Sequence, residues 1–200
     1  MKKILIVLAV ILVVTLSACA SSGVKRVDAG TQTDLSGYWN DTDVRIVCEA
    51  LINDCLNSAR VDQAIKNKRG TPKVIVGRFK NESSEHIDTG IISSTLESVI
   101  FNSGKLDFVA GGSTRDDLRA ERQDQQTQAS ERTAAALGNE TGADFMLTGT
   151  VKAIVDKAGN QSVRTYFVNA EMSDISTNQR IWMAQNSDIK KVVTRAKNKL

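Results

Sequence analysis

The first nineteen residues constrain the fate of this chain more than any other segment. Met1-Lys2-Lys3 is a short positive start, residues 4–16 form an apolar run that only Thr15 interrupts, and Leu16-Ser17-Ala18-Cys19 follows. A basic start, a short apolar core and small residues before a cut site are typical of a signal peptide. The apolar run is also shorter than a comfortable membrane span. We therefore expect residues 1–18 to be removed as a signal peptide.

Cys19 gives the signal peptide a more specific meaning. An ordinary secretory signal needs no thiol at its cleavage point, whereas Leu-Ser-Ala-Cys resembles the lipobox of bacterial lipoproteins. The resemblance implies that diacylglycerol is added to the Cys19 thiol, that the chain is cut after Ala18, and that the new amino group is acylated. Several acyl chains hold a protein stably at a membrane, and one chain does not. The alternative is a plain signal peptide in which Cys19 has no role.

The segment after the cysteine predicts a tether and a location. Residues 19–37 hold the lipidated cysteine and a flexible linker rich in Ser, Gly and Thr, with no apolar period. Residue 20 is Ala, not Asp, which resembles the outer-membrane export signal of enteric bacteria. We expect a lipid-anchored protein at the outer membrane, facing the periplasm, with residues 38–200 as one domain.

The charge of the mature chain excludes one class of partner. The whole chain carries a formal net charge of +3, and loss of Lys2 and Lys3 lowers it to +1. Proteins that bind nucleic acid present a strong basic field to the phosphates, which this chain lacks. We therefore expect no nucleic-acid partner.

Apolar periodicity and turn residues predict an α/β domain after residue 38. The expected helices are one containing residues 44–56 and capped by Asp41 or Thr42, one over 89–102 capped by Asp88 and ended by Gly104, a polar one from Ser113, and one over 130–140. The expected strands are 73–79, 106–109, 145–155 with a turn at 156–160, 162–174, and one from Arg180; residues 190–200 are expected to fray. We predict a single domain with a mixed four- to five-stranded sheet, packed helices and a C-terminal antiparallel meander.

Residues able to do chemistry form no recognisable constellation. The single histidine, His86, has no nucleophile motif to serve, and Gly111-Gly112 lacks the spacing of a phosphate-binding loop. Cys48 and Cys55 are seven apart on the expected helix, too far for a disulfide, and no further ligands suggest a metal site. We predict two buried thiols, no enzyme, no cofactor, no metal and no small-molecule substrate.

The polar helix from Ser113 leaves two interpretations open. Its residues surround Leu118 with charged and amide side chains, so it is a mobile insertion or a surface that faces a partner. Arg119 and Arg122 are the candidate docking residues on the second interpretation. The docking surface as a whole is otherwise unknown from the sequence.

Several motifs, taken in order, resemble the LpoB-type lipoproteins. These are residues 72–76 with the loop Asn81-Glu82-Ser83-Ser84, the helix end at Gly104-Lys105-Leu106, the segment 141–149 (Thr-Gly-Ala-Asp-Phe-Met-Leu-Thr-Gly), and Asp174 to Trp182 with its Thr-Asn turn. The match covers residues 40 to 190 and the lipobox. It implies a fold related to the curli secretion lipoprotein and to the N-terminal domain of TolB.

The resemblance also implies a function. It implies a non-enzymatic outer-membrane lipoprotein that binds a class A penicillin-binding protein and activates it in peptidoglycan synthesis. An alternative is a lipoprotein subunit of an envelope secretion or transport assembly of the curli type, although no pair of long amphipathic inserts is evident. A third is a structural lipoprotein that has lost its partner.

Overall fold

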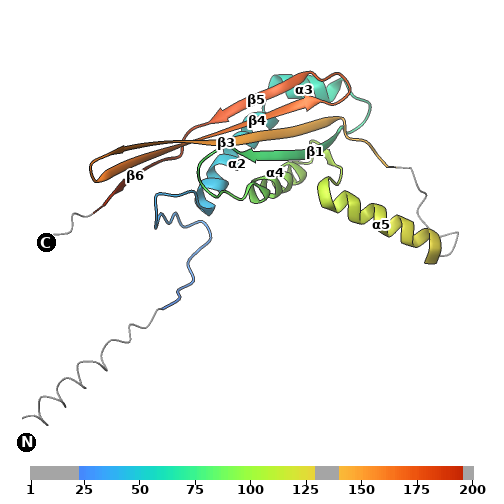
Figure 1. Ribbon diagram of the computed structural model, residues 1–200. Helices are drawn as coiled ribbons and strands as arrows, with labels where there is room; N and C mark the ends of the chain where they lie inside the picture. The colour runs from blue at the N-terminus through green and yellow to red at the C-terminus, as the bar shows by residue number, and fades with distance from the viewer. Residues whose placement is uncertain (1–22, 129–139, 196–200) are drawn as a thin grey trace, which may run out of the picture. The chain divides into compact units, whose positions relative to one another are not determined.

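The computed structural model describes residues 23–128 and 140–195 (Figure 1). The chain divides into two compact units, Met1–Thr31 and Gln32–Leu200, and the domain lies in the second unit. Cys19, the signal peptide and most of the helix expected over 130–140 lie outside the described residues. No helix within the described ranges is long and apolar enough to cross a membrane.

A mixed sheet organises the domain, as predicted. Its strands in the described residues are β1 (Lys73–Asn81), β2 (Asp107–Phe108), β3 (Phe145–Ala158), β4 (Gln161–Asp174), β5 (Arg180–Asn186) and β6 (Lys190–Thr194). The order is β2-β1-β3-β4-β5, with β6 also paired to β4. The β2–β1 and β1–β3 pairs are parallel, and the pairs that β4 makes with β3, β5 and β6 are antiparallel. The C-terminal meander is therefore present.

Strand β6 corrects the expectation that residues 190–200 fray. Residues 190–194 pair with the beginning of β4, from Thr165↔Lys190 to Gln161↔Thr194. Backbone pairing and the two valines at 192 and 193 outweigh the basic composition of this segment, because lysines are tolerated on an edge strand. The sheet consequently has six strands, one more than the four to five expected.

The β3–β4 hairpin is also longer than predicted. We expected a turn over residues 156–160, but the two strands pair as far as Ala158↔Gln161 and leave only Gly159 and Asn160 in the turn. Gly159 has a φ of 57°, a value that glycine adopts without strain. Because the pairing of β1 with β3 ends at Asn81↔Val151, the hairpin continues past β1. We call residues 152–165 together with β6 the arm (Figure 1).

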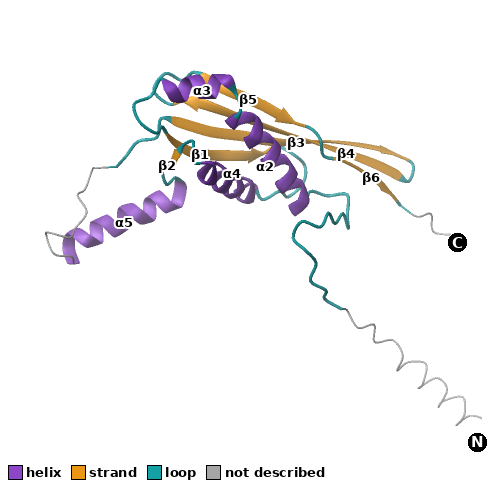
Figure 2. Ribbon diagram, turned by 180° about the vertical axis from the view of Figure 1, so that it is seen from behind, coloured by secondary structure: helices purple, strands orange, loops and turns teal. Residues whose placement is uncertain are grey.

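Helices cover one face of the sheet (Figure 2). They are α2 (Asp41–Leu56), α3 (Ala59–Lys66) and α4 (Thr89–Ser103); a fourth described helix, α5 (Gly112–Gln128), follows β2. The cap of α2 is Asn40 rather than Asp41 or Thr42, since Asn40 and Asp43 form a reciprocal capping box. The predicted caps of α4 are confirmed: the Asp88 side chain accepts from the Gly90 N–H, and Gly104 has a φ of 66°.

The core lies between this face of the sheet and helices α2 and α4. Its largest fully buried side chains include Ile52, Ile92, Leu96, Phe145, Leu147, Tyr166 and Met172. In β4 the buried residues alternate with half-buried ones, as the period of a strand requires. Burying one such aliphatic or aromatic side chain stabilises the domain by roughly 1.5–3 kcal/mol.

Cys48 and Cys55 both lie on α2, as predicted, and both are buried as free thiols. Burial away from water disfavours the thiolate and raises the pKa of each thiol to about 12. The two cysteines therefore pack as small apolar side chains.

Candidate docking site

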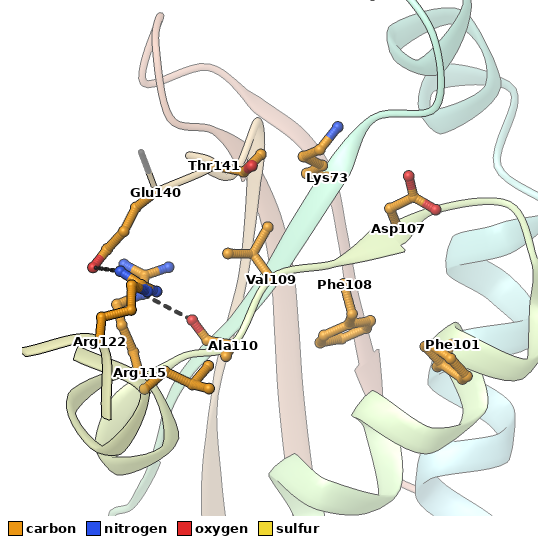
Figure 3. Close-up of a pocket in the computed structure, with 11 residues that line it drawn as sticks. Lys73, Phe101, Asp107, Phe108, Val109, Ala110, Arg115, Arg122, Glu140 and Thr141 are labelled. Atoms are coloured by element: carbon orange, nitrogen blue, oxygen red, sulfur yellow. Dashed lines mark hydrogen bonds and ion pairs between the residues drawn. The ribbon is translucent and has the colours of Figure 1, made fainter. Parts of the chain in front are cut away.

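A hollow of the described surface lies at the β2 edge of the sheet, beside α5 (Figure 3). It has a volume of about 610 Å³. Its lining comes from β1, the end of α4, β2, α5 and the segment before β3; the residues are Lys73, Phe101, Asp107, Phe108, Val109, Ala110, Arg115, Leu118, Arg122, Glu140 and Thr141. We call this hollow the β2 groove.

Two apolar side chains stand exposed at the β2 groove. Helix α4 turns Ile92, Leu96 and Ile100 into the core, which leaves Phe101 on the outside with 65% of its surface exposed. Leu118, the large apolar residue of α5, is 44% exposed. Exposed aromatic and aliphatic side chains next to arginines are typical of surfaces that bind another protein.

The start of α5 is fixed by backbone geometry. Gly111 passes so close to Ile75 that an added Cβ would lie 2.9 Å from its side chain, and Gly112 has a φ of 52°. The Arg115 guanidinium then donates from Nε to the Ala110 carbonyl at 2.8 Å. The loop between β2 and α5 therefore positions Arg115 at the β2 groove.

Glu140 holds the two arginines that the sequence offered as docking residues. Arg119 donates through Nε and Nη2 at 2.8 and 3.1 Å, and Arg122 donates through Nη1 at 2.9 Å. These charge-assisted bonds, with Arg119 first, hold the pKa of the Glu140 carboxyl down at about 2. Arg122 lines the β2 groove and Arg119 does not, so a partner that used either guanidinium would have to compete with Glu140.

The motif residues of the sequence meet at one end of the sheet and have a structural role. Lys68 lies 2.7 Å from Asp174 and 3.8 Å from Asp144. Asp144 also accepts from the Lys73 N–H at 2.8 Å, and Asp174 caps the turn through Ser176 and Thr177. The Lys68 ammonium and these turn donors lower the pKa of Asp174. Both aspartates thus organise strand ends.

Two further motif residues, Trp182 and Gly149, also have a structural role. The Trp182 indole N–H donates to Asp54 on α2 at 2.8 Å, which joins β5 to the helical layer. Gly149 faces Phe79 and the Asn169 carbonyl so closely that no Cβ fits. These two positions are set by packing.

A partly buried ionic cluster joins the last residues of the expected linker to the arm. The Lys191 ammonium on β6 lies 2.7 Å from Asp34 and 2.6 Å from Asp43, and it donates to the Tyr38 carbonyl at 3.0 Å. Gly37 is buried beside Val193. We call this set the Lys191 cluster.

A second set of polar groups lies beside it. Tyr166 donates from its hydroxyl to Glu85 at 2.6 Å, and Arg164 lies 3.0 Å from the other Glu85 oxygen, close enough for an ion pair but not aligned as a hydrogen bond. The Arg164 guanidinium stacks on the Tyr38 ring at 4.2 Å. Burial and the Glu85 carboxylate raise the pKa of Tyr166.

Neither polar set was predicted from the sequence, where the available signal was the alternation of residues along β4. Arg164 shares its face of β4 with Tyr166 and Val168, so an alternating pattern places a cation on the buried side. His86, in contrast, is exposed in the loop before α4, as expected. Among the residues with described placement, no group of His, Cys, Asp and Glu is arranged to hold a metal ion.

The fold defines a single α/β domain with a mixed, helix-covered sheet, and comparison with known proteins specifies the family. The profile of the family described as "Peptidoglycan-synthase activator LpoB" matches residues 43–187. The match spans more than half of the chain, and the chain belongs to the LpoB family. A search of curated protein sequences gives no match.

Solved structures show the following likenesses. The LpoB C-terminal domain from Escherichia coli is 13% identical, with a TM-score of 0.45, and the alignment covers 76% of this chain and 99% of that one. The corresponding domain from Salmonella enterica is 16% identical over 67% and 92%, with a TM-score of 0.35. Lipoprotein GNA1162 from Neisseria meningitidis is 16% identical over 64% and 88%, with a TM-score of 0.36.

Proposed function

We propose that this protein is an outer-membrane lipoprotein that faces the periplasm, where it binds and activates a class A penicillin-binding protein in peptidoglycan synthesis. The observation that carries the proposal is the family match over residues 43–187. The signal peptide and lipobox of residues 1–19 support the anchor, with Cys19 as the lipidated residue. The family match does not favour the secretion-assembly alternative.

Activation by such a protein is a shift of population. A regulator that performs no chemistry changes the rate of a synthase only by binding its active conformation more tightly than its inactive one. A tenfold difference in affinity between the two conformations corresponds to about 1.4 kcal/mol.

The β2 groove is the docking surface that we assign to the synthase. It combines the exposed Phe101 and Leu118 with cationic and anionic side chains, and an apolar centre with a charged rim is the usual composition of an interface. Glu140 forms ion pairs with both Arg119 and Arg122 of α5, which would present these side chains to a partner in a fixed arrangement.

A polymerisation assay with matched variants tests the function and the groove together. The chain from residue 20, produced without lipid, is added to a purified class A synthase, and the rate of glycan formation is measured. We expect acceleration by the wild type and loss of acceleration in Phe101→Asp and Leu118→Asp. Ile91→Asp is the control, because Ile91 is 53% exposed on the same helix as Phe101 but does not line the groove.

Three outcomes would contradict parts of this proposal. A folded wild-type chain that leaves the synthase rate unchanged would reject the activator function. Equal acceleration by all three variants would reject the β2 groove as the docking surface. For the anchor, labelling with radioactive palmitate should be lost in Cys19→Ser, and persistent labelling would reject Cys19 as the lipidated residue.

A further inference from the structure

Within residues 23–128 and 140–195, no strand pairs with the outer edge of β3 in the arm. Strand β3 pairs with β1 only as far as Val151, and the last cross-strand contact there is the Glu82 N–H donating to the Val151 carbonyl at 2.8 Å. Residues 152–158 continue to pair with β4 on their other side. Seven residues of β3 therefore present an edge that pairs with no described strand and carries no proline, and such an edge is a template for pairing with another chain.

The direction of the backbone groups on this edge follows from the contact at Val151. In an antiparallel strand, the N–H and C=O of one residue point to the same side, and the side alternates with each residue. Because the Val151 carbonyl points away from β4, the N–H and C=O groups of Ala153, Val155 and Lys157 also point to the free edge. These six groups have no partner from the pairing of β3 with β4.

The side chains of the edge form a self-complementary order. When two copies of residues 152–158 are laid antiparallel about a two-fold axis at Val155, Lys152 lies opposite Ala158, Ala153 opposite Lys157, and Ile154 opposite Asp156. No like charges then face each other. Lys152 is the diagonal neighbour of the second copy's Asp156, within reach of a long side chain.

We propose that the free edge of β3 pairs with the same edge of a second copy, so that two arms join into one continuous sheet. The pairing supplies partners for Ala153, Val155 and Lys157 on both copies. It covers Ile154, which is 62% exposed in the single chain. Lys152 at present lies 3.2 Å from Glu82, and both side chains are about half exposed. Such a surface ion pair is weak enough to exchange for Asp156 of the second copy.

The charge order favours a second copy over other occupants. A neutral or acidic strand from another protein would supply hydrogen-bond partners for the backbone groups of the free edge. It would not pair Lys152 with Asp156 on both sides of a two-fold axis, as a second copy does. The interface is small, so association is expected to be weak in dilute solution. Chains held on one membrane surface meet at a raised effective concentration, which favours a weak pair.

A pair of proline variants tests the edge directly. Val155→Pro removes an N–H that points to the free edge of β3 and costs no bond within the hairpin. Val192→Pro is the matched control. On β6, Val193 and Lys191 form the pairs with Ser162 and Arg164 of β4. The N–H of Val192, which lies between them, therefore points away from the sheet at the arm's other edge. Sedimentation equilibrium of the chain from residue 20, over a wide range of concentration, gives the mass.

We expect the wild type and Val192→Pro to form dimers as concentration rises, with at least a tenfold weaker association for Val155→Pro. Far-ultraviolet circular dichroism checks that each variant is folded. A wild type that stays monomeric at the highest concentration, or a Val155→Pro variant that associates as well as Val192→Pro, would overturn the proposal.

A charge exchange provides a test that leaves the backbone intact. Asp156→Lys should weaken the dimer, because it places two lysines diagonally across the axis, and the double variant Lys152→Glu with Asp156→Lys should restore it. Failure of the double variant to associate more strongly than Asp156→Lys would contradict the register. This test does not depend on the synthase, so its result is separate from that of the proposed function.

Discussion

Lys191 on β6 lies 2.6 Å from Asp43 on α2, and the two side chains are 10% and 4% exposed. The contact joins a strand near the end of the chain to the first helix of the domain. Asp43 is also part of the capping box of α2. This buried ion pair therefore links the beginning of the helical layer to the arm.

Removal of the Lys191 ammonium should destabilise the domain. Lys191→Met leaves the buried Asp43 carboxylate without its cation, and a broken buried ion pair costs about 3 kcal/mol. Urea unfolding of the chain from residue 20 measures the loss. Lys190→Met is the control, because Lys190 is exposed on the same strand, and it should change stability by less than about 0.5 kcal/mol. Equal effects of the two variants would show that the Lys191 cluster adds no stability.

Gly149 should not tolerate a side chain. A Cβ at this position would collide with the Phe79 ring and the Asn169 carbonyl, and overpacking of this kind costs roughly 1–3 kcal/mol. Thermal unfolding of Gly149→Ala should show a lower midpoint than wild type. Gly142→Ala, in the same motif, has nothing within 4 Å of the added Cβ and should leave the midpoint nearly unchanged. A Gly149→Ala variant as stable as wild type would contradict the close packing of β1 on β3.

Glu140 should titrate at unusually low pH. Its pKa in the folded chain is lowered to about 2 from an ordinary value of 4.5, chiefly by Arg119 and then by Arg122. A lowered pKa means that the contact stabilises the fold above pH 4.5 and is lost as the pH falls towards 2. The carbon chemical shift of the Glu140 carboxyl, followed by NMR, should have its midpoint near the lower value. Arg119→Gln with Arg122→Gln should return the midpoint towards 4.5, and an ordinary midpoint in the wild type would show that Glu140 does not hold α5.

The thiols of Cys48 and Cys55 should be inert in the folded chain. Each is buried and has a pKa raised to about 12, so little thiolate exists at pH 8. Iodoacetamide should modify neither residue in buffer and both in strong urea, as mass spectrometry of the chain from residue 20 would show. Rapid modification in buffer would mean that α2 opens locally.

The sequence predicted the parts of the fold that depend on local patterns. The caps of α4 and the existence of strand β4 follow from residue type and period, and both are present. Strand β6 was not predicted, because its composition is basic and its stability comes from pairing with residues about thirty positions earlier. The extra length of β3 was not predicted, because the segment that begins with Asp156 and Lys157 reads as a turn. In the structure, cross-strand pairing holds these two residues in the strand.

The candidate sites were less predictable than the fold. The Gly-Ala-Asp segment and the Asp174 turn were among the motifs that indicated the family, but Asp144 and Asp174 proved to organise strand ends through Lys68. The exposure of Phe101 depends on how α4 lies on the sheet, which no local pattern specifies. The Lys191 cluster brings together residues more than 140 positions apart, so only the tertiary structure reveals it.

The Lys191 cluster also determines how the domain would bear a mechanical load. The Asp34 carboxylate and the Tyr38 carbonyl both contact the Lys191 ammonium of β6. Trp39 lies against Tyr166 of β4, with ring centroids 5.2 Å apart. Tension applied through the N-terminal segment would reach these contacts before it reached α2 or the apolar core. Such tension would thus strain the root of the arm first, whereas the β2 groove lies on another edge of the sheet.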